Sequence, residues 1–600
     1  MEFEQKAEEK KMSMSKNIAR LAVTAGLTAA LSFGGVMAPV TMAFAAEGVP
    51  GSITINKVAE DNKDNTFKAY QIFKAKVVDE KDNKGKVASD IEWANNAIGS
   101  KVTTAITESA EYKALVKKDP AKELKKGASA SDVAEWLSQN VNRTHASSAD
   151  SSDGTRVAPG DVLYEIAAAV SGMKQGVQAE TAAGTLTADT PWTRPGTYGD
   201  GYYLFVSDGL TDTTKQNTGT SPIFAIVGGG PVTVTEKTSI PKVDKKILDD
   251  TVGKDVANAE EKDWKNYGDA RIGQKIDYRL TGTVADNIAS YDKYQYVFQD
   301  HLSVGLKADE NSIVVTINGK KIDKSGNYYT ATVTDTTDDL NNKTGQDLKV
   351  SFDDLKAAAN SVNVTLDGTS KVVVTYQATL TSDAKYTTAG NTNEVKLVYS
   401  NDPMSNGTGT SEPKKVTDYV FGFDVTKTDP DNSSAQLVAG FTVKMTKEGS
   451  GKNVEKWLKQ DGSFSNNKND AYTFETTETG NKVFIPGLVA GTYLISESKT
   501  PAGYNTIADF EITVTPEYNT DGTLKKLSVA PGSDMVAVNI KDGATTTRIP
   551  VTIQNKKGSG LPLTGLNGVT FTWIAGGAVL CIGVAHLIRS RKQAEESEQE

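Results

Sequence analysis

Between its two ends, the chain alternates apolar and polar residues in short runs that are rich in Val, Thr, Ile and Tyr. Successive side chains of a β-strand point to opposite faces, so a period of two predicts strands that each bury one face. Gly, Asn and Asp separate the runs, as is typical of turns. Many short strands of this kind indicate β-sandwiches. The sequence therefore predicts an all-β chain of tandem immunoglobulin-like sandwich domains.

Three of these runs open three units, at 52–55, 243–247 and 421–428. The first unit is also expected to contain some helix, because 121–142 is rich in helix formers and Ser131-Asp132 offers an N-cap. Breaks at 228–231 and 405–415 separate the units. The predicted divisions are an N-terminal segment 1–45, three domains 46–236, 237–415 and 416–557, and a C-terminal segment 558–600.

Thiol, imidazole and charge content exclude several classes of protein. The chain has 66 basic and 76 acidic side chains, a net charge of −10, which argues against a nucleic-acid partner. Its three His residues and its single Cys581 lie far apart in sequence, so no metal or cofactor spacing is present. A disulfide within the chain is impossible, and stability must come from packing or from another cross-link.

The N-terminal segment has the pattern of a secretory signal peptide. A basic stretch at 16–20 precedes the apolar, small residues of 21–33, and Ala43-Phe44-Ala45 offers a small-x-small cleavage pattern. A transmembrane helix is the alternative, but Gly and Pro interrupt the run. Met12 and Met14 are alternative starts, because the leader before them is acidic.

At the other end, 566–588 is long and apolar enough to span a bilayer, and Arg589, Arg591 and Lys592 follow it. Just before it stands Leu561-Pro562-Leu563-Thr564-Gly565, which resembles the LPxTG sorting signal of Gram-positive surface proteins. The resemblance implies that a sortase cleaves between Thr564 and Gly565, passes Thr564 to an amine, and leaves the protein anchored to the cell wall. A simple one-pass membrane protein is the alternative.

In the third unit, polar side chains continue three apolar stripes that should face the core. These continuations are Lys427 after Phe421, Phe423 and Val425; Glu497 after Tyr493 and Ile495; and Asn555 after Val551 and Ile553. Lys and Glu are seldom fully buried without partners. Any one of them could be a strand end that faces water. Three together, on the first, an intermediate and the last strand, favour a common role.

The chemistry that these three groups could perform together is amide exchange. Burial pushes a Lys toward the neutral amine, which is a nucleophile, and a Glu toward the neutral acid. The acid can polarise an Asn amide and pass a proton to departing ammonia. Packing supplies the effective concentration that an unreactive amide needs. The product is a Lys–Asn isopeptide bond.

The segment 493–504, YLISESKTPAGY, resembles the E-box of Cna-B-type domains in sortase-assembled pilins, YxLxETxAPxGY. Ser498 stands where the family has Thr, and Thr500 where it has Ala. The resemblance implies that Glu497 is the catalytic acid, Lys427 the amine and Asn555 the amide.

The middle unit repeats the arrangement, and 241–245 and 393–403 resemble the first and last strands of the pilin middle domain. Strand parity assigns a Lys245–Asn401 bond with Asp300 as the acid. Asn391 and Asn393 share the parity of Asn401 and remain alternatives, and Asp277 is a weaker acid candidate. In the first unit, the closing strands lack Asn, so no bond is predicted and Lys57 should be solvated.

The segment 232–237, VTVTEK, loosely resembles the pilin motif whose lysine accepts the sorting carbonyl. It makes Lys237 the expected acceptor, with Lys242 as the alternative. The family resemblance implies a non-enzymatic major pilin, joined head to tail by a pilus-specific sortase and anchored to peptidoglycan by a housekeeping sortase, with minor pilins and host ligands as partners. The alternative is a wall-anchored adhesin or minor pilin that does not polymerise. A secreted hydrolase has no convincing Ser/His/Asp set in its favour.

Overall fold

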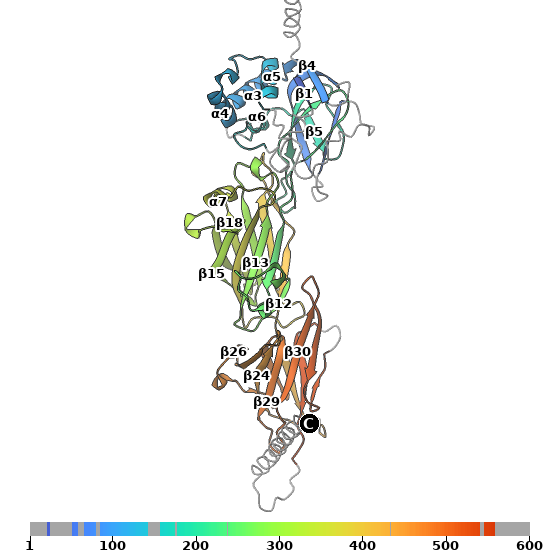
Figure 1. Cartoon of the computed structure of the whole chain (residues 1–600). Helices are drawn as coiled ribbons and strands as arrows, with labels where there is room; N and C mark the ends of the chain where they lie inside the picture. The colour runs from blue at the N-terminus through green and yellow to red at the C-terminus, as the bar shows by residue number, and fades with distance from the viewer. Residues whose placement is uncertain are drawn as a thin grey trace, which may run out of the picture.

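The computed structural model describes residues 21–24, 51–57, 65–79, 85–141, 157–173, 177–236, 238–432, 434–540 and 545–558. Figure 1 shows three units that follow one another end to end along the chain. Strands dominate all three, and each unit has its own buried apolar core or cores. The chain is therefore predominantly β and consists of tandem β-sandwich domains, as its alternating pattern predicts.

The first unit combines an antiparallel main sheet, a small mixed sheet and helices. Its main sheet has the strand order β1-β4-β3-β7-β8 with β5 beside β3, and a small sheet has the order β6-β2-β9. Strand β2 pairs in parallel with β9, so the first and last strands within 51–236 are neighbours. The strands are β1 (Leu21–Thr24), β2 (Ser52–Asn56), β3 (Thr66–Asp79), β4 (Gly85–Trp93), β5 (Gly184–Thr187), β6 (Trp192–Thr193), β7 (Gly201–Asp208), β8 (Ile223–Val227) and β9 (Val232–Thr235).

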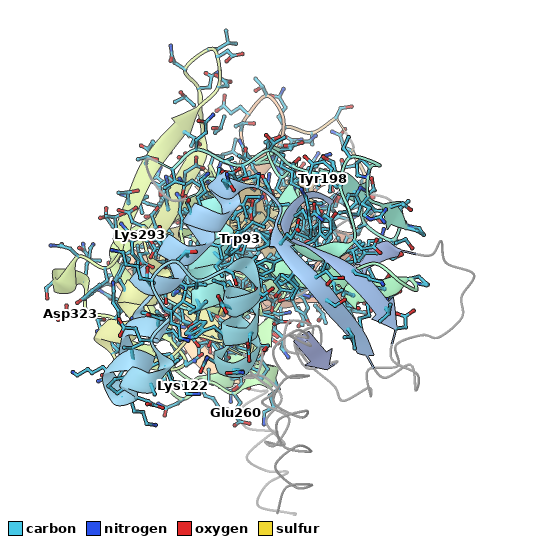
Figure 2. All side chains as sticks on the ribbon, turned by 90° about the horizontal axis from the view of Figure 1, so that it is seen from above. Trp93, Lys122, Tyr198, Glu260, Lys293 and Asp323 are labelled. Carbon is cyan, nitrogen blue, oxygen red and sulfur yellow. The ribbon has the colours of Figure 1, made fainter. Side chains whose placement is uncertain are left out.

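The described α-helices of this unit lie together on one side of its strands (Figure 1). Trp93 at the end of β4 stacks on Phe73, with ring centroids 4.8 Å apart, and lies centrally in the view along the long axis (Figure 2). The predicted N-cap of the third helix is wrong by two residues, because Ser129 and Asp132 form the capping box. The helices are α3 (Asn96–Glu108), α4 (Ala110–Lys118), α5 (Ala130–Asn140) and α6 (Val162–Ser171), with a 3-10 turn at Pro120–Lys122.

The middle unit is a sandwich of two sheets. One has the order β11-β10-β13-β19-β15-β16, and the other β12-β22-β20-β14-β18-β17 with β21 beside β20. Its elements are β10 (Val243–Leu248), β11 (Trp264–Lys265), β12 (Tyr267–Asp269), β13 (Lys275–Thr283), β14 (Tyr296–Ser303), β15 (Leu306–Ile317), β16 (Lys320–Lys321), β17 (Thr330–Thr337), β18 (Lys343–Phe352), α7 (Leu355–Ser361), β19 (Lys371–Leu380), β20 (Asn391–Ser400), β21 (Thr408–Thr410) and β22 (Lys414–Tyr419), with 3-10 turns at Asp250–Val252, Glu261–Asp263, Ile288–Ser290 and Lys324–Gly326.

The third unit is also a two-sheet sandwich, with the orders β28-β23-β33-β32 and β26-β25-β24-β29-β30-β31, and β27 beside β24. Its first strand, β23, and its last, β33, are parallel neighbours in one sheet. Its elements are β23 (Phe421–Thr428), β24 (Gly440–Glu448), β25 (Asn453–Leu458), β26 (Phe464–Ser465), β27 (Phe474–Glu475), β28 (Lys482–Leu488), β29 (Gly491–Lys499), β30 (Phe510–Tyr518), β31 (Leu524–Pro531), β32 (Val536–Val538) and β33 (Arg548–Gln554), with a 3-10 turn at Lys468–Asp470.

Hydrogen bonds and ring contacts join the units. Between the first and the middle unit, Asn401 donates from Nδ2 to Asn217 Oδ1 (2.7 Å). Between the middle and the third unit, the rings of Tyr267 and Tyr518 stack with centroids 4.2 Å apart. Because β22 pairs with β20 and β12, strand pairing carries the middle unit to Tyr419, slightly beyond the predicted boundary at 415.

The predicted signal peptide lies outside the described residues apart from 21–24, and the predicted membrane span 566–588 lies wholly outside them. Within the described part of the chain, no helix has the length and apolar character that crossing a membrane requires.

Candidate functional site

Parallel pairing of the first and last strands builds the site in the third unit. Along β23 and β33, Thr428 is the register partner of Gln554, and the Asn555 main-chain N–H donates to the Thr428 carbonyl (3.1 Å). Lys427 and Asn555 therefore leave neighbouring strands at the same level. Both side chains belong to inward stripes, because the alternation that buries Phe423 and Ile553 also places them in the core.

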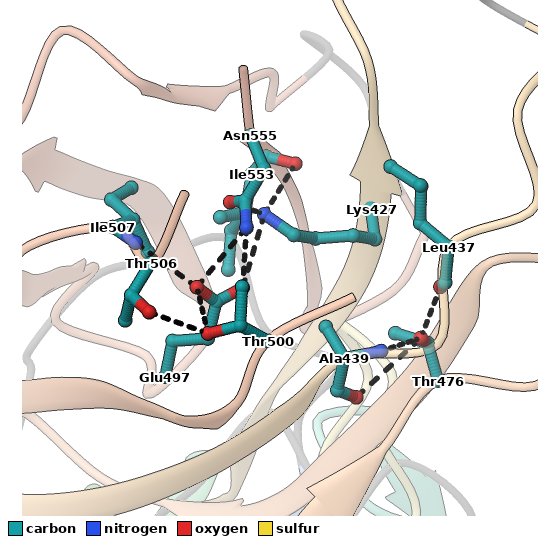
Figure 3. Close-up of polar contacts among 10 residues, drawn as sticks. All are labelled: Lys427, Leu437, Ala439, Thr476, Glu497, Thr500, Thr506, Ile507, Ile553 and Asn555. Carbon is teal, nitrogen blue, oxygen red and sulfur yellow. Dashed lines mark hydrogen bonds and ion pairs between the residues drawn. The ribbon is translucent and has the colours of Figure 1, made fainter. Parts of the chain in front are cut away.

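Figure 3 shows the three predicted side chains of this unit in contact. Lys427 Nζ donates to Asn555 Oδ1 and lies 3.5 Å from Glu497 Oε1. Asn555 Nδ2 donates to both carboxylate oxygens of Glu497, at 2.9 and 3.1 Å. The side chains of Lys427 and Glu497 are 0% exposed. The carboxylate, which comes from β29 in the opposite sheet, thus touches both the amine and the amide.

Local contacts hold these groups in place. Glu497 Oε2 accepts from the Ile507 main-chain N–H (3.0 Å) and from Thr500 Oγ1 (3.3 Å). The Nζ atom of Lys427 lies 5.9 Å from the centroid of the Phe441 ring. Burial lowers the pKa of Lys427 to about 8, although the negative charge of Glu497 opposes this shift. A smaller share of protonated amine favours nucleophilic attack.

In the middle unit, Lys245 on β10 and Asp300 on β14 meet across the two sheets. Lys245 Nζ forms an ion pair with Asp300 Oδ1, and both side chains are 0% exposed. Burial lowers the pKa of Lys245 to about 8 and raises the pKa of Asp300, and their mutual charge opposes both shifts. The two shifts bring the pKa values closer together, so moving a proton from the amine to the carboxylate costs less than it does in water.

The hydrogen bonds of Asn401, which was predicted as the amide partner of Lys245, lead to the first unit. Asn401 follows the far end of β20, where its Nδ2 contacts Asn217 of the first unit. Asn393, eight positions earlier on the same face, donates from Nδ2 to the Tyr376 hydroxyl at 2.7 Å, and that hydroxyl donates to Asp300 Oδ2 at 2.6 Å. Strand β20 rises by about 3.3 Å per residue, so parity identifies the correct face but not the height along the strand.

Asn391, the other residue of the same parity, has a structural role. Its Oδ1 accepts from the Lys385 main-chain N–H (2.8 Å), and its Nδ2 donates to the Asp418 carbonyl (3.3 Å). Asp277 lies on the opposite face of β13, where Gln377 Nε2 donates to it (2.9 Å). Of the three amides, that of Asn393 is therefore the one that is linked to Asp300, through the Tyr376 hydroxyl.

The remaining predicted residues are placed separately. Lys57 is partly exposed and pairs with Asp189 at 3.2 Å. Lys242 is exposed, and its main-chain N–H donates to Thr283 Oγ1 (2.9 Å). Lys237 and the sorting motif, Leu561, Pro562, Thr564 and Gly565, lie outside the described residues. Among the residues that the structure describes, no three His, Cys, Asp or Glu side chains are grouped as metal ligands would be.

Sequence reasoning missed Tyr376. It lies in the inward stripe of β19 with Val372, Val374, Ala378 and Leu380, where a tyrosine has the same pattern as a core aromatic residue. The signal that could have identified it is its hydroxyl, because a fully buried tyrosine usually hydrogen-bonds another buried polar group.

One family model matches part of the third unit. Residues 422–527 match the family model described as SpaA, a prealbumin-like fold domain. The match includes Lys427 and Glu497 and ends before Asn555. No curated protein matches the chain.

Solved structures of low identity also match. The T6 backbone pilin of Streptococcus pyogenes is 14% identical, with 85% of this chain and 99% of that chain covered at a TM-score of 0.46. The Corynebacterium diphtheriae major pilin SpaA is 15% identical, with 64% and 87% covered at a TM-score of 0.37. The group B streptococcus pilus 2b backbone protein is 21% identical, with 49% and 97% covered at a TM-score of 0.33.

Proposed function

We propose that the chain is the structural shaft subunit of a covalently polymerised pilus and that two of its domains are cross-linked internally by Lys–Asn isopeptide bonds. One observation carries the proposal: Lys427, Glu497 and Asn555 form a buried amine, acid and amide in mutual contact. Keeping an ion pair in such a core carries a desolvation cost, and conversion of the amine and amide to a neutral isopeptide removes the charge of Lys427.

The proposed reaction needs only the groups present. Glu497 takes a proton from the Lys427 ammonium, and the neutral amine attacks Cγ of Asn555. The carboxyl passes a proton to the departing Nδ2, and the regenerated carboxylate accepts the second proton from the attacking nitrogen. The products are the isopeptide and ammonia. A bond from Lys427 to Asn555 closes a loop of 128 residues, which by analogy with a disulfide stabilises the unit by about 4–5 kcal/mol through the unfolded state.

In the middle unit we assign the corresponding bond to Lys245 and Asn393, with Asp300 as the acid. The support is the buried Lys245–Asp300 pair and the contact of Asn393 with the same polar cluster through Tyr376. No bond is assigned to the first unit, where the partly exposed Lys57 pairs with Asp189.

Polymerisation rests on the sequence motifs. A pilus-specific sortase would cleave between Thr564 and Gly565 and join Thr564 to Lys237 of the next copy, with Lys242 as the alternative acceptor. The exposed position of Lys242 before β10 suits an acceptor. Such head-to-tail joining gives an open filament. A housekeeping sortase would attach the filament to peptidoglycan, at the cell surface of a Gram-positive bacterium, together with minor pilins.

Two measurements test the proposal. Intact-mass spectrometry of the secreted chain should show a mass that is two ammonia molecules below that of the sequence, and a mass equal to the sequence contradicts both internal bonds. Expression with its sortase should give a ladder of SDS-resistant multimers, which Lys237→Ala with Lys242→Ala abolishes. Wall-linked monomers alone would favour a non-polymerising adhesin.

A further inference from the structure

In the middle unit, the hydroxyl of a buried tyrosine lies among the amine, the acid and the amide. The hydroxyl of Tyr376 accepts from Lys245 Nζ (3.2 Å) and from Asn393 Nδ2 (2.7 Å), and it donates to Asp300 Oδ2 (2.6 Å). Tyr376 is 2% exposed. One hydroxyl has one donor and two acceptor positions, so these three contacts use its full capacity.

The hydroxyl of Tyr376 connects an acid and an amide that have no direct contact among the described hydrogen bonds. In the third unit, Glu497 contacts the amide nitrogen of Asn555 directly. Aspartate is one methylene shorter than glutamate, and the described contacts link Asp300 to Asn393 through the hydroxyl of Tyr376. An acid that does not contact the leaving nitrogen needs an intermediate group to deliver a proton to it.

We propose that Tyr376 is a catalytic residue of the middle-unit reaction, which bridges Asp300 to the leaving nitrogen of Asn393 and carries the proton between them. The inference rests on the proposed function.

Asp300 takes a proton from the Lys245 ammonium, and the neutral amine attacks Cγ of Asn393. As the bond from Cγ to Nδ2 breaks, the Tyr376 hydroxyl gives its proton to Nδ2 and receives one from Asp300. The regenerated carboxylate accepts the second proton from the attacking nitrogen. The products are the isopeptide and ammonia, and Tyr376 ends unchanged.

The surroundings keep Tyr376 in the protonated form that this role requires. Burial raises the pKa of Tyr376 well above its ordinary value, and the charge of Asp300 adds to the effect. The ring is also held against that of Tyr278, with centroids 5.2 Å apart and an interplanar angle of 17°. Stacking fixes the ring plane, so the hydroxyl oxygen stays among its three partners.

The test follows bond formation in the full chain, made by cell-free synthesis and sampled over time. Tryptic peptides that join Lys245 to Asn393 and Lys427 to Asn555 are quantified in the same sample. Tyr376→Phe should slow the middle bond about 100-fold and leave the third-unit bond at its wild-type rate. The matched control is Tyr296→Phe, which removes another buried hydroxyl from the same core, bonded to the Thr283 carbonyl (2.7 Å). It should form both bonds normally.

A second measurement covers the case in which Tyr376→Phe does not fold. Synthesis with fluorotyrosine keeps every ring and hydroxyl but makes the hydroxyl more acidic. The rate of the middle bond, divided by that of the third-unit bond, should change severalfold, because no tyrosine contacts Lys427, Glu497 or Asn555 among the described hydrogen bonds. A merely structural Tyr376 would leave the ratio unchanged.

The outcomes separate the two proposals. If the Lys245–Asn393 bond forms as fast in Tyr376→Phe as in the wild-type chain, the catalytic role of Tyr376 is overturned and the proposed function stays intact. The absence of the Lys245–Asn393 peptide from the wild-type chain overturns the middle-unit bond and the role of Tyr376 together, whereas the third-unit bond is judged by its own peptide.

Discussion

The two polar clusters differ in how the carboxylate reaches the amide and in which strands they join. In the third unit, Glu497 touches both Lys427 and Asn555, whose strands β23 and β33 are neighbours in one sheet. In the middle unit, Asp300 touches Lys245 and meets Asn393 through Tyr376, and the strands of Lys245 and Asn393 belong to opposite sheets.

The difference shows that the same three chemical groups can be assembled in two geometries. Within one sheet, the amine and amide lie side by side, and a long carboxylate from the opposite sheet contacts both. Across a sandwich, the amine and carboxylate contact each other, and the amide is connected by an additional hydroxyl. A bond within the sheet would join the first and last strands of its unit, whereas a bond between the sheets would hold the two layers together.

The largest expected effect comes from removing each acid in turn. Glu497→Gln should slow the third-unit bond about 10²–10⁴-fold and spare the middle bond, because a neutral amide cannot accept the proton of the Lys427 ammonium. Asp300→Asn should slow the middle bond by a similar factor and spare the third-unit bond. Quantified cross-linked peptides measure both bonds in each variant. Loss of both bonds from one substitution would contradict the independence of the two clusters.

The next largest effect is expected from replacing Asn393 or Asn401, the two candidate amide partners of Lys245. Asn393→Ala should remove the middle bond and lower the free energy of unfolding of that unit by about 4–5 kcal/mol. Asn401→Ala should keep the bond and cost only about 1–3 kcal/mol, because it leaves buried groups at the junction with the first unit unpaired. Urea unfolding and the intact mass of both variants test this. A missing bond in Asn401→Ala alone would restore the assignment made from strand parity.

The smallest effect is a pH dependence of stability. Asn555→Ala leaves Lys427 as an amine, whose pKa of about 8 in the folded chain is below the ordinary value of about 10.4. Between these values the unfolded chain binds more protons, so the free energy of unfolding should rise with pH by about 1 kcal/mol per pH unit at most. Lys427→Met in the same background serves as the control and should remove this rise. Identical pH profiles of the two variants would show that Lys427 is not buried as a titrating amine.

Local patterns were sufficient to predict a mostly-β chain and the inward faces on which the third-unit residues lie. Alternation places Lys427, Glu497 and Asn555 on inward faces, and the parallel pairing of β23 with β33 brings the first and the last of them together. The division into three units also follows from breaks in the pattern. The N-cap of α5 was misplaced, because Ser129 and Ser131 are both acceptable cap residues, and only the helical register distinguishes them.

The middle-unit amide could not be chosen from the sequence, because its position depends on pairing between distant strands. Asn391, Asn393 and Asn401 share one face of the β20 segment, but the register places Leu302 beside Asn393 and Val395 beside Asp300. That register is set by contacts across the whole sheet. Tyr376 was hidden for a related reason, since the contacts of its hydroxyl depend on how distant strands of both sheets are placed.

The parallel pairing of β23 with β33 has a mechanical consequence. The chain enters the third unit at Phe421 and leaves it beyond Asn555, next to the far end of the same strand pair. Once an isopeptide joins Lys427 to Asn555, tension along a filament would pass through one strand and one covalent bond. Residues 428–554 would carry no load, so the rest of the sandwich could unfold or refold under force without lengthening the fibre.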